Sequence, residues 1–302
     1  MSRPEDRRRF LGKAASLAGA AVGLASLPAG AIEPLVRNGA SKFKFSLAAY
    51  SYRSLLSGEK PKLKLDDFIR DCADMQLEAT ELTSYYFPKE ITPEYLRGLK
   101  QLCFHLGLDV SGTAVRNDFA LPPGEERQSD IDHVKRWVDY SEILGAPVIR
   151  VFAGHVQKGS SEAEAHKRIV AGMEECCDYA GQHGVHLALE NHGGPTSTAD
   201  GLLAIVRDVK SPWFGVNLDT GNFHTEDIYG DLERVAPYAM NVQIKVVVSG
   251  LDEKKQPADF PRLAEILRQV AYRGYVVLEH EERGNPRESC PTLVDRMRSA
   301  FS

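Results

Sequence analysis

The most constraining feature of this sequence is an alternation of short apolar runs with longer segments of helical period, which begins near residue 43. Each run is rich in Val, Ile, Leu or Phe, as expected of a strand that is buried on both faces. The predicted strands are Phe43–Ala49, Ala79–Leu82, Asp109–Thr113, Val148–Phe152, His186–Glu190, Phe214–Leu218, Met240–Lys245 and Tyr275–Leu278.

The segments between these runs have the hydrophobic period of amphipathic helices. The predicted helices are Leu65–Met75, Thr92–Leu106, Ser129–Leu144, Ala163–His183, Thr198–Val209, Asp227–Ala236, Pro261–Val270 and Glu288–Phe301. Eight strand–helix pairs in about 260 residues predict a single-domain α/β fold, the (β/α)8 barrel. A doubly wound open sheet is the alternative. It would place a glycine-rich dinucleotide loop after the first strand, and Leu47–Tyr52 contains no glycine.

Glycines punctuate the predicted connections just before four of the strands. Gly107, Gly145, Gly184 and Gly274 each stand between a predicted helix and the next apolar run. Glycine commonly ends a helix in the left-handed conformation, which turns the chain toward the next strand. We therefore expect these four residues to terminate the helices that precede them.

The first 31 residues have the order of a twin-arginine export signal. Arg7-Arg8-Arg9 is followed by a mild apolar stretch over 14–27 and by Ala29-Gly30-Ala31, a small-residue cleavage site. The stretch is too short and too weakly apolar for a stable membrane span. We expect residues 1–31 to be removed, leaving a periplasmic or otherwise extracytoplasmic barrel of residues 32–302. A disordered basic tail is the alternative.

Composition excludes two classes of partner. The whole chain has a net charge of −5, and its first 31 residues carry five basic and two acidic side chains, so the remainder has a charge of −8. Nucleic acids and anionic membranes attract basic surfaces, so neither is expected as the main partner. The five cysteines are odd in number and irregularly spaced, which argues against a disulfide framework. Self-association into a homo-oligomer stays open.

Polar residues end four consecutive predicted strands. Glu190, Asp219, Gln243 and Glu279 should all reach the C-terminal rim of the barrel, where active sites of this fold lie. Close carboxylates are costly to bury without a cation, so the pattern predicts one divalent metal ion. Alternatively, each acid caps a neighbouring helix or pairs with a lysine. Gln243 and Lys245 alternate along one strand and therefore face the same side.

These motifs resemble those of the xylose isomerase-like barrels, a family of sugar isomerases, epimerases, dehydratases and lyases. The resemblance covers about residues 45–301 and is carried mainly by four segments: 189–194 (LENHGG), 218–223 (LDTGNF), 243–245 (QIK) and 278–281 (LEHE). It implies that Glu190, Asp219 and Glu279 are metal ligands. The remaining ligand of the family is commonly histidine, and here that position is Gln243.

Two departures from the family pattern affect the expected chemistry. With Gln243 the ligands are all oxygen, which favours Mn²⁺ or Mg²⁺ over Co²⁺ or Zn²⁺. Many ketose epimerases carry a histidine three residues after the aspartate ligand; here that position is Asn222, and His224 lies two residues further on. Both Asn222 and His224 are candidates for substrate binding.

A metal-bound hydroxy-ketone would lose a proton to form an enediolate. Glu190 and Glu279 are the expected proton-transfer groups, and Lys245 would stabilise the oxyanion or protonate a leaving group, unless it only pairs with an acid. The substrate is expected to be a non-phosphorylated carbohydrate, because the chain is predicted to be exported and has no glycine-rich phosphate cradle. The other expected substrate-binding residues are Glu81, Arg150, His155 and His192.

Three other functions are alternatives to a sugar isomerase or epimerase. A β-eliminating lyase or dehydratase acting on a 3-keto-glycoside would use the same residues. A non-catalytic sugar-binding barrel is favoured by the Gln243 departure and by the absence of the epimerase histidine. An endonuclease of the abasic-site type shares the barrel. It would need a histidine-rich zinc cluster and a basic face, which nine scattered histidines and an acidic chain do not provide.

Overall fold

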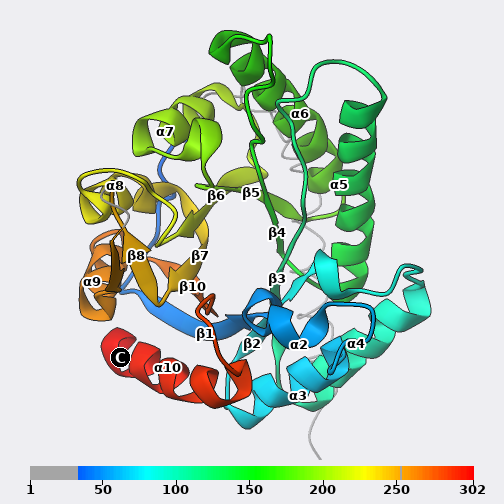
Figure 1. Ribbon diagram of the computed structural model, residues 1–302, viewed down its shortest axis with the longest axis vertical. Coiled ribbons are helices and arrows are strands. Elements are labelled where there is room, and N and C mark those ends of the chain that lie inside the picture. Colours follow the sequence, from blue (N-terminus) through cyan, green and yellow to red (C-terminus); the bar gives the residue numbers. More distant parts are fainter. Residues whose placement is uncertain (1–32, 252–253) are drawn as a thin grey trace, which may run out of the picture.

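The computed structural model describes residues 33–251 and 254–302, in which eight parallel strands close into a barrel wrapped by helices (Figure 1). The order around the barrel is β1, β10, β7, β6, β5, β4, β3, β2. These strands are β1 Lys42–Ala48, β2 Ala79–Thr83, β3 Asp109–Ala114, β4 Val148–Val151, β5 His186–Glu190, β6 Phe214–Asp219, β7 Ala239–Lys245 and β10 Arg273–Glu279. The predicted (β/α)8 barrel is confirmed. The predicted export signal lies outside the described residues.

A helix follows each barrel strand, close to its predicted bounds. They are α3 Leu65–Asp74, α4 Pro93–His105, α5 Glu125–Leu144, α6 Glu162–Gln182, α7 Ala199–Asp208, α8 Ile228–Val235, α9 Phe260–Gln269 and α10 Pro286–Phe301. Helix α5 begins four residues before its predicted start, and Glu125 and Glu126 place negative charge in its first turn, where it favours the helix. Two elements were not predicted from the sequence: the short helix α2 (Arg53–Leu56) and the hairpin of β8 (Val247–Ser249) and β9 (Lys255–Pro257).

Three of the four predicted glycine helix ends are confirmed. Gly107, Gly145 and Gly184 have φ values of 73°, 78° and 67°, in the left-handed region that glycine reaches without strain. The prediction is wrong for Gly274, because Ala271 takes the left-handed conformation there (φ 49°) and Gly274 lies inside β10. A Cβ on Gly274 would lie 2.8 Å from the Tyr272 hydroxyl, so close packing explains this glycine.

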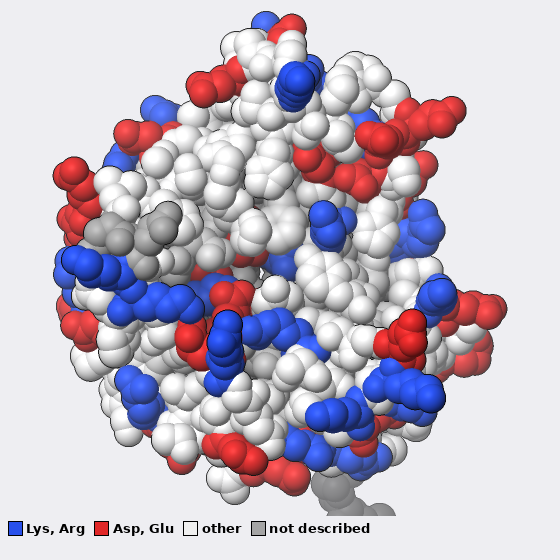
Figure 2. Space-filling view, viewed as in Figure 1, with Lys and Arg blue, Asp and Glu red and all other residues white. Residues whose placement is uncertain are grey.

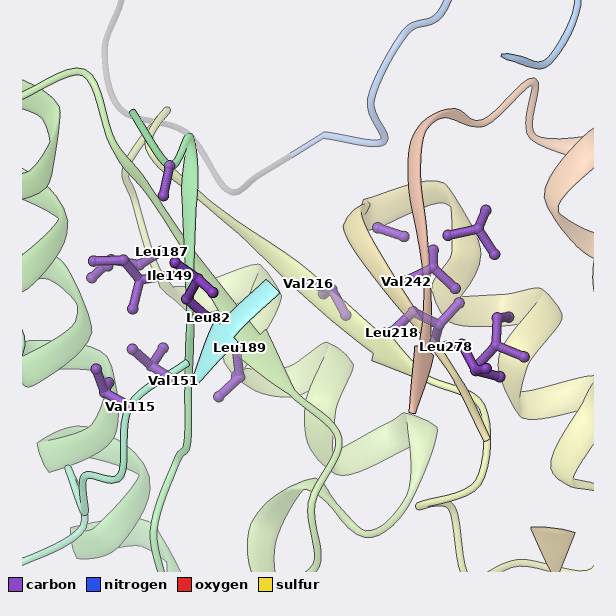
Figure 3. Close-up of a cluster of buried hydrophobic side chains, with 14 of the residues drawn as sticks. Leu82, Val115, Ile149, Val151, Leu187, Leu189, Val216, Leu218, Val242 and Leu278 are labelled. Carbon is purple, nitrogen blue, oxygen red and sulfur yellow. The ribbon is translucent and has the colours of Figure 1, made fainter. Parts of the chain in front are cut away.

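The apolar core lies between the barrel and its helices rather than inside the barrel. Side chains alternate along a strand, so the Val, Ile and Leu residues of one face all point the same way. Figure 3 labels side chains of this core, all on barrel strands except Val115, which directly follows β3: Leu82, Val115, Ile149, Val151, Leu187, Leu189, Val216, Leu218, Val242 and Leu278. The other face of the same strands points into the barrel. It carries Ser46 and Ser111, whose hydroxyls are 2.8 Å apart, and the charged groups of the site.

No helix in the described part of the chain is long and apolar enough to cross a membrane. The cysteines are Cys72, Cys103, Cys176, Cys177 and Cys290, and all five are buried and unpaired. This confirms that the fold is not held by disulfides.

Candidate functional site

The barrel interior holds all the buried Asp, Glu, Lys and Arg side chains of the described chain. They are Glu81, Arg150, Glu190, Asp219, Lys245 and Glu279, and each is at most 6% exposed. They come from six different strands and cluster toward the C-terminal ends. When all are ionised, four carboxylates face two cations, so two negative charges are uncompensated. A charged cluster of this cost inside a barrel indicates a functional site.

Glu190 ends β5 and is held by two side chains. Its Oε2 lies 2.8 Å from Nε of Arg150, and its Oε1 accepts a hydrogen bond of 2.8 Å from Nδ2 of Asn222. Burial raises the pKa of Glu190 to about 7, although the positive charge of Arg150 opposes the shift. This carboxyl group can therefore gain or lose a proton near neutral pH.

Lys245, at the end of β7, lies among three carboxylates. Its Nζ is 2.5 Å from Oε2 of Glu279, 2.9 Å from Oε1 of Glu281 and 3.4 Å from Oδ2 of Asp219. Burial alone would lower the pKa of Lys245, but these carboxylates raise it well above its ordinary value. For Glu279, burial acts in the other direction and would raise the pKa. The charge and hydrogen bond of the Lys245 ammonium group outweigh burial, so the pKa of Glu279 lies below its usual range. Lys245 is cationic and Glu279 ionised at neutral pH.

Asp219 ends β6 in a fully buried position. Its Oδ1 accepts a hydrogen bond of 2.8 Å from the backbone N–H of Gly221, whereas its Oδ2 is buried with no hydrogen-bond partner in the described structure. Gly221 is needed here, because a Cβ would lie 2.6 Å from Cγ of Lys245. Burial raises the pKa of Asp219 well above its ordinary value. The ammonium group of Lys245, at 3.4 Å, is the cation near this Oδ2, and a closer cation would be favourable there.

A layer of side-chain amides lies beneath these charges. Gln243 donates a hydrogen bond of 2.8 Å from Nε2 to Glu81, and its Oε1 accepts one of 2.7 Å from Asn217. Asn241 donates to the second oxygen of Glu81 (3.0 Å) and to Asn217 (2.9 Å). Burial, followed by the charge of Glu279, raises the pKa of Glu81 to about 7. The amides thus hold a carboxyl group that is poorly solvated as an anion.

A cleft of about 860 Å³ opens over this cluster at the C-terminal mouth of the barrel. Figure 2 shows acidic and basic side chains together around the central hollow of this face. Six of the predicted site residues line the cleft: Arg150, His155, Glu190, His192, Lys245 and Glu279. Asp219, Gln243, Glu81 and Asn222 are not among the lining residues; the first three are buried and Asn222 is half-buried against Glu190. His224 is exposed and is not a lining residue.

The described side chains do not form a ready-made metal site. Among residues 33–251 and 254–302, no group of three His, Cys, Asp or Glu side chains is placed to hold a metal ion as it stands. The ammonium group of Lys245 lies between Asp219 and Glu279 instead. The donor types and the two excess negative charges nevertheless suit a hard divalent cation.

A comparison with protein families decides the classification. The family model described as "xylose isomerase-like TIM barrel" matches residues 69–300, which is well over half of the chain. The chain belongs to this family. A human protein provisionally named hydroxypyruvate isomerase is 25% identical to this chain over 267 residues, covering 82% of this chain and 95% of that protein.

Solved structures confirm the fold of this xylose isomerase-like chain. D-psicose 3-epimerase from Clostridium cellulolyticum H10, solved with D-tagatose, has a TM-score of 0.71 and 15% identity, covering 86% of this chain and 99% of its own. 3-Keto-D-glucoside 4-epimerase from E. coli has a TM-score of 0.67 and 16% identity, covering 85% of this chain and 100% of its own. At such identities the likeness establishes the barrel.

Several residues of the site were not predicted from the sequence. Asn217 lies two residues before Asp219 on β6, and Asn241 lies two residues before Gln243 on β7. Residues two apart on a strand face the same side, so this period alone could have placed both asparagines on the inner face. Other residues that were not predicted line the cleft from loops, from the 3-10 turn Ser84–Tyr86 and from helix α5. They are Tyr85, Arg116, Asn117, Asp118, Ser129, Asp130, His133, Arg136 and Glu281.

Proposed function

We propose that this chain is a sugar isomerase or epimerase that moves a proton on a carbon next to a carbonyl group, through an enediolate. The placement of Glu190 and Glu279 is the observation that supports the proposal. Both are buried carboxylates that line one cleft, and their strands are three positions apart around the barrel, so a substrate could lie between them. Two similar structures are named as epimerases, which invert a sugar carbon. The human relative is named as an isomerase.

In the chain without metal the two carboxylates differ in how tightly they hold a proton, which suits proton transfer at two faces of a carbon. Glu279 is kept ionised by Lys245, so it can accept a proton from the substrate. Glu190, with a pKa of about 7, can return a proton from its own side of the cleft. Lys245 and Arg150 provide positive charge for the enediolate oxygens.

We also propose one divalent metal ion, Mn²⁺ or Mg²⁺ in preference to Co²⁺ or Zn²⁺. Glu190, Asp219 and Glu279 would hold it. It would neutralise the two excess charges and bind Oδ2 of Asp219, which accepts no hydrogen bond in the described structure. Gln243 is the proposed fourth ligand, since its oxygen accepts only one hydrogen bond and keeps a second lone pair. When bound, such an ion polarises the carbonyl and hydroxyl oxygens of a substrate and stabilises an enediolate.

The proposed substrate is a free sugar or keto-sugar outside the cytoplasm. This part rests on the predicted export of the chain by a twin-arginine signal over residues 1–31. Sugar phosphates are cytoplasmic metabolites, so an exported enzyme would meet non-phosphorylated sugars.

Elimination on a 3-keto-glycoside is the second candidate reaction. The similarity to a protein that acts on a 3-keto-D-glucoside favours it, and so does a cleft larger than one sugar ring requires. The first step would be the same proton removal. The carbanion would then expel the group on the neighbouring carbon, and Lys245, still carrying its proton, would protonate the departing oxygen.

Proton NMR in heavy water tests this proposal. Metal-stripped protein, with and without added Mn²⁺, is incubated with a panel of ketoses and 3-keto-glycosides. Exchange of a proton next to the carbonyl group, with a new epimer or isomer, is the expected result. Exchange with loss of the aglycone and formation of an enone would assign the lyase. No exchange with any sugar, despite measurable sugar binding, would contradict the proposal and leave a binding protein.

A further inference from the structure

Lys245 is built so that its charge can move while its backbone stays in place. Its backbone N–H donates a hydrogen bond of 2.9 Å to Oγ1 of Thr220. Gly221 packs against the first part of the side chain, because a Cβ at that glycine would lie 2.6 Å from Cγ of Lys245. The rest of the stem is flexible, as in any lysine, and the residue lines the cleft. The ammonium group can therefore change partners without any movement of β7.

The three carboxylates that contact this ammonium group are of two kinds. Asp219 and Glu279 are buried, and both belong to the proposed set of metal ligands. Glu281 lies two residues beyond the end of β10 and outside that set, and its side chain is 41% exposed. Its Oε1 is 2.9 Å from Nζ of Lys245. Lys245 thus already contacts one carboxylate that a metal ion on the other two would leave free.

The backbone that carries Glu281 is held by the segment directly after β1. The guanidinium group of Arg53 donates hydrogen bonds to the backbone carbonyls of His280 (3.0 Å) and Glu281. The backbone N–H of His280 donates a hydrogen bond of 2.9 Å to Oγ of Ser51. Three hydrogen bonds therefore fix the chain at this point, so Glu281 is a stationary acceptor beside a mobile ammonium group.

We propose that the ammonium group of Lys245 leaves Asp219 and Glu279 when these two residues bind a divalent metal ion. Glu281 then holds it at the cleft, which both residues line. This inference rests on the metal ion of the proposed function. Lys245 would neutralise two carboxylates in the metal-free chain, and in the loaded chain it would face the substrate. Glu281 is the positioning residue for this second role.

Two opposite effects on metal affinity follow from this exchange. Lys245 competes with a metal ion for the same carboxylates, and its positive charge repels the ion at short range, so it weakens binding. Glu281 offsets part of this effect, because it gives the displaced ammonium group a carboxylate partner. The contribution of Glu281 to metal affinity should therefore depend on the presence of Lys245.

Mn²⁺ affinity in a double-mutant cycle tests the proposal. Calorimetric titration, at fixed pH and ionic strength, compares the wild type with Lys245→Met, Glu281→Gln and the variant that carries both changes. Methionine keeps most of the lysine stem without its charge. Glu282→Gln is the matched control, because Glu282 is the next residue along the chain and pairs with Lys255 on the hairpin instead.

We expect Lys245→Met to bind Mn²⁺ about tenfold more tightly than the wild type, and Glu281→Gln about tenfold more weakly. When Lys245→Met is already present, Glu281→Gln should change the affinity by less than about threefold. Glu282→Gln should match the wild type.

The inference is overturned if Lys245→Met binds Mn²⁺ no more tightly than the wild type, or if Glu281→Gln causes the same loss in both backgrounds. Should Lys245→Met not fold, the two glutamine variants decide, since equal affinities of Glu281→Gln and Glu282→Gln also overturn it. Mn²⁺ binding that is the same in every variant removes only the exchange of partners. An absence of Mn²⁺ binding in every variant removes the proposed metal ion as well.

Discussion

The substitution Glu81→Gln gives the sharpest energetic prediction. Glu81 is 1% exposed, and its pKa is raised from 4.5 to about 7 by burial and by Glu279. Because the folded-state pKa is higher than the unfolded one, the folded state binds the proton more tightly. The free energy of unfolding therefore falls as pH rises from about 4.5 to about 7. At pH 8 the raised pKa of Glu81 lowers the free energy of unfolding by about 3 kcal/mol, relative to a pH at which Glu81 is protonated in both states.

Glutamine keeps the shape of the protonated acid and removes the titration. Glutamine also replaces one carboxyl oxygen, which accepts a hydrogen bond, with an NH2 group, which donates. This NH2 group faces the side-chain NH2 group of Asn241 or Gln243, and the lost hydrogen bond costs about 1 kcal/mol. At pH 8 the variant should therefore be more stable than wild type by about 2 kcal/mol, or roughly 3–4 °C in Tm for a barrel of this size. At pH 4.5 it should be slightly less stable.

Urea unfolding of chelator-treated protein at several pH values between 4.5 and 8 measures this difference. The exposed-site variant Glu90→Gln is the control and should follow the wild type throughout. A difference between Glu81→Gln and wild type that does not change with pH would refute the reasoning, because it would mean that Glu81 does not titrate in this window.

Three further substitutions have defined outcomes. Glu190→Gln should lower kcat for proton exchange by about 10²–10⁴-fold while keeping sugar binding; full activity would exclude Glu190 as a proton-transfer group. Arg150→Met should lower the free energy of unfolding by about 3–5 kcal/mol, measured in urea at pH 8, because Glu190 loses its ion pair at 2.8 Å; an unchanged midpoint would show that the pair contributes nothing. Gly154→Ala should lower Tm, because φ is +93° and a Cβ would lie 1.8 Å from Oδ1 of Asp118; a wild-type Tm would contradict this contact.

The barrel was predictable because its signal is periodic and local. Strands and helices follow from hydrophobic patterns that repeat eight times, and an error at one boundary leaves the others unaffected. The error at Gly274 has a tertiary cause, since Ala271 turns the chain while Gly274 makes room for Tyr272. Propensity in the sequence cannot reveal which neighbour needs that space.

The inner part of the site was predictable for a related reason. Residues at strand ends converge at one rim in this fold, so Glu190, Lys245 and Glu279 could be placed in one cleft before any coordinates. The partner of each side chain could not be predicted. That Lys245 lies between Asp219 and Glu279, and that Gln243 bonds Glu81 and Asn217, depends on distances across the barrel. Arg116 and Arg136 were missed because they lie on a loop and a helix face.

The central claim is that the buried carboxylates at the barrel mouth share one divalent cation. Crystals grown with Mn²⁺ and measured for anomalous scattering test it most directly. We expect one strong peak about 2.1 Å from oxygens of Glu190, Asp219 and Glu279. The ammonium group of Lys245 should then no longer lie between Asp219 and Glu279. A map without such a peak, in which Lys245 still bridges Asp219 and Glu279, would contradict it.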